Sequence, residues 1–429
     1  MPMIRVVPPS RRAATSGLPE SIKRETRRSL KLPESGPIIA TGHAPMHWHP
    51  GILAKFMAMR VLSQEQHATP LVLNIDTVTG DPGLIEVPFI DRDGLPCSST
   101  IRLFDSNPDV SLGMQPATEP ADLNWLDGID DFRSEPLVNL STAVHSARGD
   151  LSLASQLMRA QLNLARSWTG RPTVLGASKL LKTACGRWLL ELMQRDTARC
   201  SEAYNAAVSV DPDAGIRPLD MTLGELPLWD IRSSERRTAR RQDLDEANLL
   251  PKALMITAIM RLAGCDLFLH GTGGARYDAL MEGWIRQWLG IEVMPFMVVT
   301  ADVLLPMPDV ETIARLGQSL VARGRRAYHD PESVEETADG PGPQKRAALE
   351  SIESAPRGSE ARREAYASMH ETLATLRVDA RETSMAIAGR VRDARRTIAR
   401  RDWDFFFHPE EALDVLADEV ENRVLDSIR

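Results

Sequence analysis

The stretch 36-GPIIATGHAPMHWHPGILAKFMAMRVLSQEQHATPLVLNID-76 decides the fold of this chain. It opens with a short apolar run, GPIIATGH, that is typical of a buried strand ending in a turn. Between Gly51 and Gln64, apolar residues recur at the spacing of one helix face. The last part, PLVLNID, is again a continuous apolar run of strand length. Strand, turn, helix and strand in this order predict a βαβ unit with parallel strands and a right-handed crossover.

The same order of elements returns in the second half of the chain. The predicted elements are a helix over 251–264 with proline at its first position, a strand over 265–271, a helix over 275–290 that ends on a glycine C-cap, and a buried strand over 296–306. Two such units predict an α/β protein with a parallel sheet at its core.

The remaining segments are expected to surround this core. We expect 84–94 and 99–105 to form an antiparallel pair added to the sheet, 224–231 to return to the sheet, and 232–242 to be a surface loop. The predicted domains are a basic N-terminal lead (1–34) with a short helix near 19–31, the first half of the core (35–117), a mainly helical insertion (118–222), the second half of the core (223–308), and a helical arm (309–429) with a flexible connector (331–358).

The segment 359–401 predicts one long helix in the C-terminal arm. Its apolar residues fall mostly at spacings of three and four, and charged residues fill the other faces. A narrow apolar seam of this kind is typical of a coiled-coil-like arm. Its partner could be the helix predicted over 310–327, the segment 344–354, or a second subunit, in which case the protein is a homodimer.

Composition narrows the classes of function. The formal net charge of −8 argues against a general nucleic-acid binder, whose footprint is usually a basic face. No apolar run reaches the roughly 18 residues that a membrane helix needs. Four cysteines without a CxxC pair fit a reducing compartment, and the basic start lacks the apolar core of a signal peptide, although a transit peptide is conceivable. We therefore expect a cytoplasmic protein that acts on a small molecule, with no nucleic-acid or membrane partner.

The first predicted turn, 42-GHAPMHWHPG-51, holds three histidines within seven residues. His43, His47 and His49 follow a parallel strand and precede a helix, which is where open α/β sheets bind ligands. We expect these three histidines to be the catalytic residues. The simpler interpretation is that they are turn and cap residues beside Trp48.

Neighbouring residues favour an anionic ligand at this turn. Gly51 would let a phosphate approach the backbone closely, with Gly42 in the same cofactor site, and Lys55 could reach the same anion one helical turn later. Asp76 and Asp81 follow the second strand, at the same sheet edge. They could bind ribose hydroxyls or Mg²⁺, or simply cap the loop, and Asp76 is included in the predicted cofactor site.

A zinc site built from the same histidines is the competing interpretation. Pro45 disrupts a helical face between His43 and His47, and the spacing of His47 and His49 suits a strand rather than a turn. No acidic ligand is adjacent. We therefore expect no zinc and predict no metal-ligating residues.

The second predicted turn, 270-HGTGGARYD-278, is rich in glycine. Its glycines permit φ > 0 and an exposed row of backbone N–H groups, as in an anion-binding nest. Arg276 could contact a phosphate or carboxylate, and Asp278 could accept from a ribose or an amine. A tight strand-to-helix turn with glycines for packing is the alternative, and we expect Lys252 and Arg261 on the preceding helix to be solvated. The predicted cofactor-binding residues of this turn are His270, Gly271, Thr272, Gly273, Gly274, Arg276, Tyr277 and Asp278.

With these motifs in hand, the chain resembles the cysteine-adding enzymes of bacillithiol biosynthesis, a family of cysteine ligases. The stretch IIATGHAPMHWHPGILAKF is similar to that family's strand, Gly-Gln-Gln turn, Gly-Pro and lysine-bearing helix. HGTGGARYD looks like its His-Gly-x-Gly-Glu-x-x-Tyr segment, and the late long helix looks like its coiled-coil arm. The resemblance implies a Rossmann-like core related to class I nucleotidylyltransferases and aminoacyl-tRNA synthetases, with a coiled coil used in dimer formation.

Three functions follow as hypotheses. The first is a nucleotide-dependent, ligase-like or nucleotidylyltransferase-like enzyme that binds ATP or another nucleotide between the two turns and activates a small carboxylate or amino-acid-type substrate. The second is a non-catalytic dimeric protein that binds a nucleotide or sugar phosphate. The third is a histidine-bound metal hydrolase.

Overall fold

The computed structural model describes residues 3–9, 17–123, 134–232, 236–244, 248–329 and 343–429. A central sheet has six strands in the order β1-β11-β10-β2-β3-β6. All neighbouring strands from β11 to β6 are parallel, and only β1 is antiparallel to its neighbour. The predicted α/β fold with a mainly parallel core is thereby confirmed. The strands are β1 (Met3–Val7), β2 (Ile38–His43), β3 (Thr69–Asn74), β6 (Thr173–Gly176), β10 (Leu267–His270) and β11 (Phe296–Asp302).

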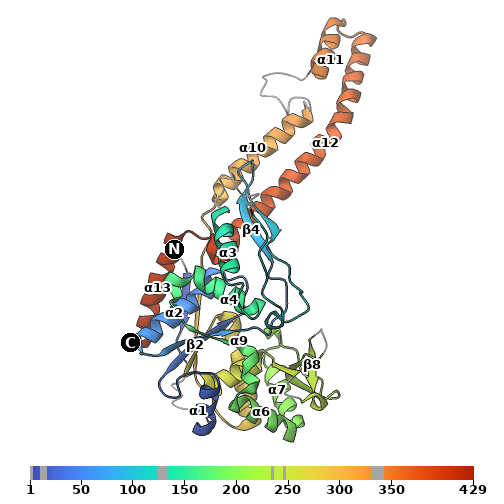
Figure 1. The fold of residues 1–429 in the computed structure, drawn as a ribbon. Helices are drawn as coiled ribbons and strands as arrows, with labels where there is room; N and C mark the ends of the chain where they lie inside the picture. The colour runs from blue at the N-terminus through green and yellow to red at the C-terminus, as the bar shows by residue number, and fades with distance from the viewer. Residues whose placement is uncertain (1–2, 10–16, 124–133, 233–235, 245–247, 330–342) are drawn as a thin grey trace. The chain divides into compact units, whose positions relative to one another are not determined.

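Each face of this sheet has its own apolar core, because successive side chains of a strand point to opposite faces. On β2, for example, Ile38 and Ala40 belong to one core, whereas Ile39 belongs to the other. Helices cover both faces (Figure 1). The first core is covered by α1 (Glu20–Ser29), α6 (Ala184–Arg195), α7 (Thr197–Val208), α8 (Ala253–Ile259) and α9 (Thr272–Leu289), and the second by α2 (Pro50–Glu65), α4 (Leu153–Leu164) and α13 (Glu410–Ile428).

The two βαβ units diverge from the centre of the sheet. The first runs from β2 through α2 to β3, and the second runs from β10 through α9 to β11. β2 and β10 are direct neighbours, yet α2 and α9 cover opposite faces. This arrangement is a topological switch point, where a crevice opens beyond the carboxyl ends of the two central strands.

Two strands of the central sheet lie outside the predicted core. β1 lies in the predicted N-terminal lead and pairs with β11 along its whole length, while β6 lies in the predicted helical insertion and pairs with β3. Both are short edge strands. In β6 only Leu175 is buried and Val174 is 46% exposed, so its sequence carries no apolar pattern that could announce a strand.

Three predictions about smaller elements are wrong. β4 (Leu84–Ile90) and β5 (Pro96–Arg102) form a separate two-stranded sheet and are not added to the central one. β7 (Glu225–Asp230) is the middle strand of another small sheet, between β8 (Arg237–Arg240) and β9 (Leu249–Pro251), so residues 237–240 are not a loop.

Two prolines shape the elements in this part of the chain. Pro227 has no N–H for a sheet ladder, and the β7–β8 register shifts between Glu225 and Trp229. Pro251 does not begin a helix, because it ends β9 opposite Leu228. The helix begins at Ala253 and continues through a π-helical turn, η7 (Met260–Gly264).

The C-terminal helix belongs with the core rather than with the arm. The chain divides into one unit of residues 1–86, 100–303 and 401–429 and a second of residues 87–99 and 304–400. In the first unit, Leu413, Leu416 and Val420 of α13 are fully buried and join the apolar core under α2. The predicted grouping of 401–429 with the arm therefore differs from the observed one.

The second unit contains the long helix expected over 359–401. This helix is α12 (Glu360–Ala399), and it packs against α10 (Val310–His329) and α11 (Pro343–Ser354) (Figure 1). Both predicted partners within the chain therefore contact it. The predicted flexible connector is partly helical, since α11 lies within it, and its residues 331–342 lie outside the described part of the chain.

None of the helices in the described part of the chain combines the length and the apolar character that crossing a bilayer requires.

Candidate functional site

The two predicted turns line one cavity of about 410 Å³ in the first unit. In the β2–β10 register Thr41 is opposite Leu269, so the first turn and the second turn leave neighbouring strands side by side. The cavity therefore lies at the switch point between β2 and β10. Its polar lining comes from Gly42, His43, His49, Gly51, Lys55, Thr257, His270, Gly271, Thr272, Gly273, Gly274, Tyr277 and Thr300, and its apolar lining includes Ile52, Leu73, Ile75, Val78, Ile256 and Phe268.

Lys55 is a buried amine in the wall of this cavity. Its side chain lies on the first turns of α2, is 5% exposed, and donates from Nζ to the carbonyl oxygen of Gly42 at 2.5 Å. Among the residues that the structure describes, no carboxylate pairs with this amine. Burial consequently lowers the pKa of Lys55 from 10.5 to about 7. The first turn thus holds a group that changes charge near neutral pH and would gain a proton beside an anion.

His43 and His49 flank the amine as neutral imidazoles. Burial and the nearby charge of Lys55 lower the pKa of His43 well below its usual range, with Nδ1 at 3.5 Å from Lys55 Nζ. Burial also lowers the pKa of His49. The His49 side chain caps α2, because its Nδ1 accepts from the N–H of Gly51 at 3.1 Å. A neutral ring that accepts at Nδ1 carries its proton on Nε2, so this imidazole is a donor there.

Gly51 serves packing rather than phosphate approach. A β-carbon at this position would lie 2.5 Å from the carbonyl oxygen of Ala301 and 2.8 Å from Cε1 of His49. The missing side chain lets the start of α2 touch β11. The interpretation that Gly51 opens the backbone to a ligand is therefore replaced by a close helix–sheet contact, although the residue still lines the cavity.

His47 is separated from the other two histidines and does not line the cavity. Its backbone is left-handed, with φ of 38°, and its Nδ1 lies 3.1 Å from Oδ2 of Asp404. Burial opposes the charged imidazolium, but the hydrogen bond and charge of Asp404 outweigh it and raise the pKa of His47. Nearby, the N–H of Phe405 donates to the carbonyl of Trp48 at 2.7 Å. These contacts with Asp404 and Phe405 thus hold the first turn in place on the side away from the cavity.

The second turn presents the amino end of a helix. α9 begins at Thr272, with Gly271 as its N-cap in extended conformation and without a side-chain cap. None of Gly271, Gly273 and Gly274 has positive φ, so the turn is not the nest that the glycines predict. The backbone N–H groups of the first helical turn nevertheless have no partner within the helix. They and the helix dipole favour a negative charge at this end of the cavity.

The three glycines of this turn differ in what their missing side chains permit. A β-carbon on Gly271 or Gly273 would meet nothing within 4 Å, whereas one on Gly274 would lie 2.5 Å from Nδ1 of His270. Gly274 therefore makes room for the His270 ring. That ring also stacks near Phe268, with 4.6 Å between ring centres.

A buried ionic network contacts the ring of His270. Its Nε2 lies 2.8 Å from Oδ2 of Asp278, and the same oxygen accepts from Nη1 of Arg261 at 2.7 Å. Arg261 also donates to Glu282 at 2.5 Å and to the carbonyl of Met294 at 2.6 Å. Burial alone would raise the pKa of Asp278, but the charges of His270 and Arg261 lower it.

This network changes two sequence-based interpretations. Asp278 is fully buried and cannot reach a ribose, so it acts on the site only through His270. Arg261 is 1% exposed rather than solvated. Its burial could not be foreseen from the helical pattern, because its carboxylate partners lie on α9, one strand later in the chain.

Three other predicted site residues lie away from this cavity. Arg276 forms a bidentate contact with Asp211 at 2.9 and 2.7 Å, on the exposed side of α9. Asp76 accepts from the backbone and side chain of Ser178 at 2.8 and 2.6 Å, which ties the end of β3 to the segment after β6. Asp81 pairs with Arg102 at 3.0 Å.

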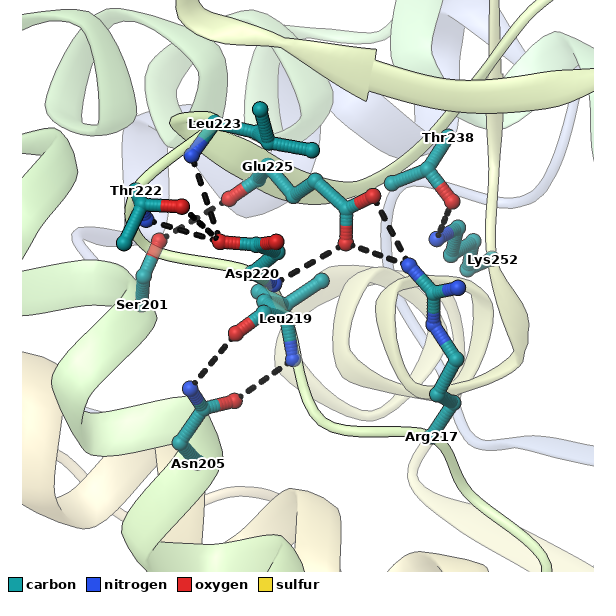
Figure 2. A network of polar contacts seen from close by, with 10 residues as sticks. All are labelled: Ser201, Asn205, Arg217, Leu219, Asp220, Thr222, Leu223, Glu225, Thr238 and Lys252. Carbon is teal, nitrogen blue, oxygen red and sulfur yellow. Dashed lines mark hydrogen bonds and ion pairs between the residues drawn. The ribbon is translucent and has the colours of Figure 1, made fainter.

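A second polar network lies beside β7. Figure 2 shows Glu225 accepting two contacts from Arg217, at 2.8 and 2.7 Å, and Lys252 donating to Thr238 at 2.8 Å. Lys252 also lies over the ring of Trp229, at 4.3 Å from its centre, and burial lowers its pKa to about 8. Lys252 is therefore not the solvated lysine that the sequence predicts. It does not line the cavity between β2 and β10.

Within the described ranges, the histidine, cysteine and acidic side chains do not come together in any group of three or more that could hold a metal ion. His47 contacts Asp404 instead of lining the cavity, which separates it from His43 and His49.

Comparisons with known proteins add little to this geometry. No protein-family model matches the chain, and no curated protein matches it. Among solved structures it is similar to tyrosyl-tRNA synthetase from Archaeoglobus fulgidus in complex with L-tyrosine, at 12% identity, over 89% of this chain and 100% of that chain, with a TM-score of 0.26. A likeness at this level carries no functional conclusion, so the function has to be inferred from the site.

Proposed function

We propose that the cavity between β2 and β10 binds the phosphates of ATP or another nucleotide, and that the protein is a ligase-like or nucleotidylyltransferase-like enzyme for a small carboxylate or amino-acid-type substrate. One observation carries the proposal. An uncapped helix N-terminus and a buried, unpaired lysine line the same cavity at a topological switch point.

Lys55 and the start of α9 would hold the phosphates. The backbone N–H groups of Thr272, Gly273 and Gly274 supply fixed donors without a net charge. Lys55 supplies a charge that depends on the ligand, because its pKa of about 7 would rise beside a phosphate and restore the ammonium. Its hydrogen bond to Gly42 keeps Nζ at the end of β2 before the ligand arrives.

His43 and His49 would stabilise charge that develops during transfer. Both are neutral, and His49 is oriented by its cap contact with Gly51, so it can donate a hydrogen bond without first reorganising. His270 would contribute from the second turn, held by Asp278. His47 is a positioning residue in this proposal, because it contacts Asp404 rather than the cavity.

The rest of the cavity sets limits on the substrate. A volume of about 410 Å³ lies within the range of small-molecule sites, which is roughly 300–1,000 Å³. Phe268, Tyr277 and several aliphatic side chains offer apolar surface for a base or a small side chain. Mg²⁺ would arrive with the nucleotide, since it is commonly held by substrate phosphates and waters. The resemblance to the cysteine ligases favours an amino acid as the acceptor.

A thermal-shift panel coupled to product detection tests this function. We expect ATP to raise the melting temperature, a carboxylate or amino acid to raise it further, and pyrophosphate or ADP to be released. Lys55→Met should lose the response to ATP, while Lys182→Met, at an exposed lysine, should keep it. If no nucleotide shifts the melting temperature at millimolar concentration, the proposal is wrong. Stabilisation without turnover would favour the second hypothesis, a non-catalytic binding protein.

The homodimer through residues 359–401 stays a prediction, as does the absence of a nucleic-acid partner. In the second unit, Ile387 and Ala394 of α12 already pack against α10, and Met369 and Leu373 pack against α11. Light scattering of the purified chain decides whether the same helix also joins two copies.

A further inference from the structure

A second cavity, of about 450 Å³, lies at the carboxyl ends of β3 and β6. None of its lining residues lines the first cavity. The alternation of β3 separates the two: Leu73 and Ile75 line the first cavity, whereas Asn74 and Asp76 line the second. The two cavities therefore meet the edge of the sheet from opposite faces and can be tested independently.

Basic side chains dominate the rim of this second cavity. Arg166 on α5 (Arg166–Thr169), Arg171 in the following loop and Lys179 after β6 are all exposed at the surface. Among the described residues, neither Arg166 nor Arg171 has a hydrogen bond or an ion pair from its side chain, and Lys179 has only a longer-range attraction to Asp76. Three basic side chains on one rim, two of them without a carboxylate partner, favour a dianionic group, and guanidinium groups fit phosphate best.

Unsatisfied acceptors line the floor of the same cavity. Asn74 is 3% exposed, and its Nδ2 donates to the carbonyl of Ala154 at 3.0 Å, while its Oδ1 has no partner. Asp150 pairs with Arg159 through Oδ1, and its buried Oδ2 has no partner either. A buried acceptor without a donor costs free energy, so each of these oxygens favours a ligand that brings a hydroxyl or an amine.

Asp76 differs from these two acceptors because it is already satisfied. Both of its oxygens accept from Ser178, and Gly176 has no side chain that would displace it, since a β-carbon there would lie 2.5 Å from Oδ2. Asp76 therefore shapes the cavity and leaves Asn74 as the central acceptor.

We infer that this cavity binds a small phosphorylated polyol, with the class of sugar phosphates as its best fit. Arg166, Arg171 and Lys179 hold the phosphate at the rim. Asn74 and Asp150 accept from hydroxyl groups on the floor. This inference does not depend on the proposed function, because the two cavities share no residue.

Calorimetric titration of the full chain with ribose 5-phosphate, and separately with inorganic phosphate, tests the inference. We expect both to bind, with ribose 5-phosphate at least about tenfold tighter, since the buried Oδ1 of Asn74 accepts a hydrogen bond from one of its hydroxyl groups. Arg166→Gln combined with Arg171→Gln should weaken both ligands by at least about tenfold. The matched control, Arg195→Gln combined with Arg199→Gln on exposed positions of α6 and α7, should leave both affinities unchanged.

A third variant separates the two parts of the ligand. Asn74→Leu should bring the affinity for ribose 5-phosphate closer to that for phosphate, because only Asp150 is then left to accept from the hydroxyl groups, with circular dichroism confirming that the variant folds. If it does not fold, the comparison of the two ligands on the wild-type chain still decides the polyol part. Equal affinity for both ligands, no binding of either at millimolar concentration, or binding that survives the double arginine substitution would each overturn the inference.

Discussion

Replacing Lys55 by methionine should make the first unit more stable at low pH while removing its affinity for nucleotide. The amine is buried, and its pKa falls from 10.5 to about 7 on folding. Since one whole pKa step is about 1.4 kcal/mol, keeping this amine buried costs about 4–5 kcal/mol below about pH 7, where it is protonated in both the folded and the unfolded chain. The unfolded state binds the extra proton between pH 7 and 10.5. The cost is therefore full below about pH 7 and disappears as the pH rises towards 10.5.

Methionine removes this pH-dependent cost but leaves the Gly42 carbonyl without its donor, a penalty of roughly 1–3 kcal/mol that does not change with pH. The quantity to compare is therefore the difference in the free energy of unfolding between wild type and Lys55→Met as a function of pH. That difference should shrink by roughly 2–3 kcal/mol between pH 6 and pH 9.

Urea titrations at several pH values measure this difference. Unfolding is monitored by the fluorescence of the eight tryptophans, all of which lie within the residues of the first unit. The exposed Lys182→Met variant should run parallel to the wild type. Parallel curves for Lys55→Met as well would show that the amine is not held neutral, and the reasoning about its charge would fail.

Three further perturbations test the neighbouring contacts. Gly274→Ala should lower the free energy of unfolding by about 1–3 kcal/mol, because the new methyl group meets the ring of His270. Gly273→Ala should be neutral or slightly stabilising, because its methyl group meets nothing. Urea midpoints compare the two variants, and equal effects would contradict the packing argument. Asp278→Asn should cost about 1–3 kcal/mol, since the buried guanidinium of Arg261 then keeps only Glu282 as a carboxylate partner, and a change below about 1 kcal/mol in thermal unfolding would count against that pairing. His47→Asn should destabilise most at pH values below the ordinary histidine pKa, and the effect should fade as the pH rises through the raised pKa; melting temperatures that show no such trend would exclude an ion pair with the C-terminal segment.

The core of the fold follows from the sequence because its signals are local. β2, α2 and β3 lie within one short stretch, and each has the periodicity of its structure. β1 and β6 could not be recognised in this way, since a strand of four or five residues is specified mainly by the partner that it meets. β1 becomes a strand by pairing with β11, almost 300 residues later.

The site was predictable in its location and only partly in its chemistry. Both turns line one cavity because they leave adjacent parallel strands, which the order of elements already indicates. His47 pairs with Asp404, and Arg276 pairs with Asp211. Because these partners are distant in the sequence, the position of both residues outside the cavity could not be predicted. The unusual state of Lys55 depends on burial without a carboxylate, and no spacing of residues can reveal that.

A crystal structure of the chain with a non-hydrolysable ATP analogue would show whether the cavity between β2 and β10 is a nucleotide site. We expect phosphate oxygens within hydrogen-bond distance of both Lys55 Nζ and the backbone N–H groups at the start of α9. An analogue bound elsewhere, or one whose phosphates contact neither group, would contradict the assignment of this cavity as a nucleotide site.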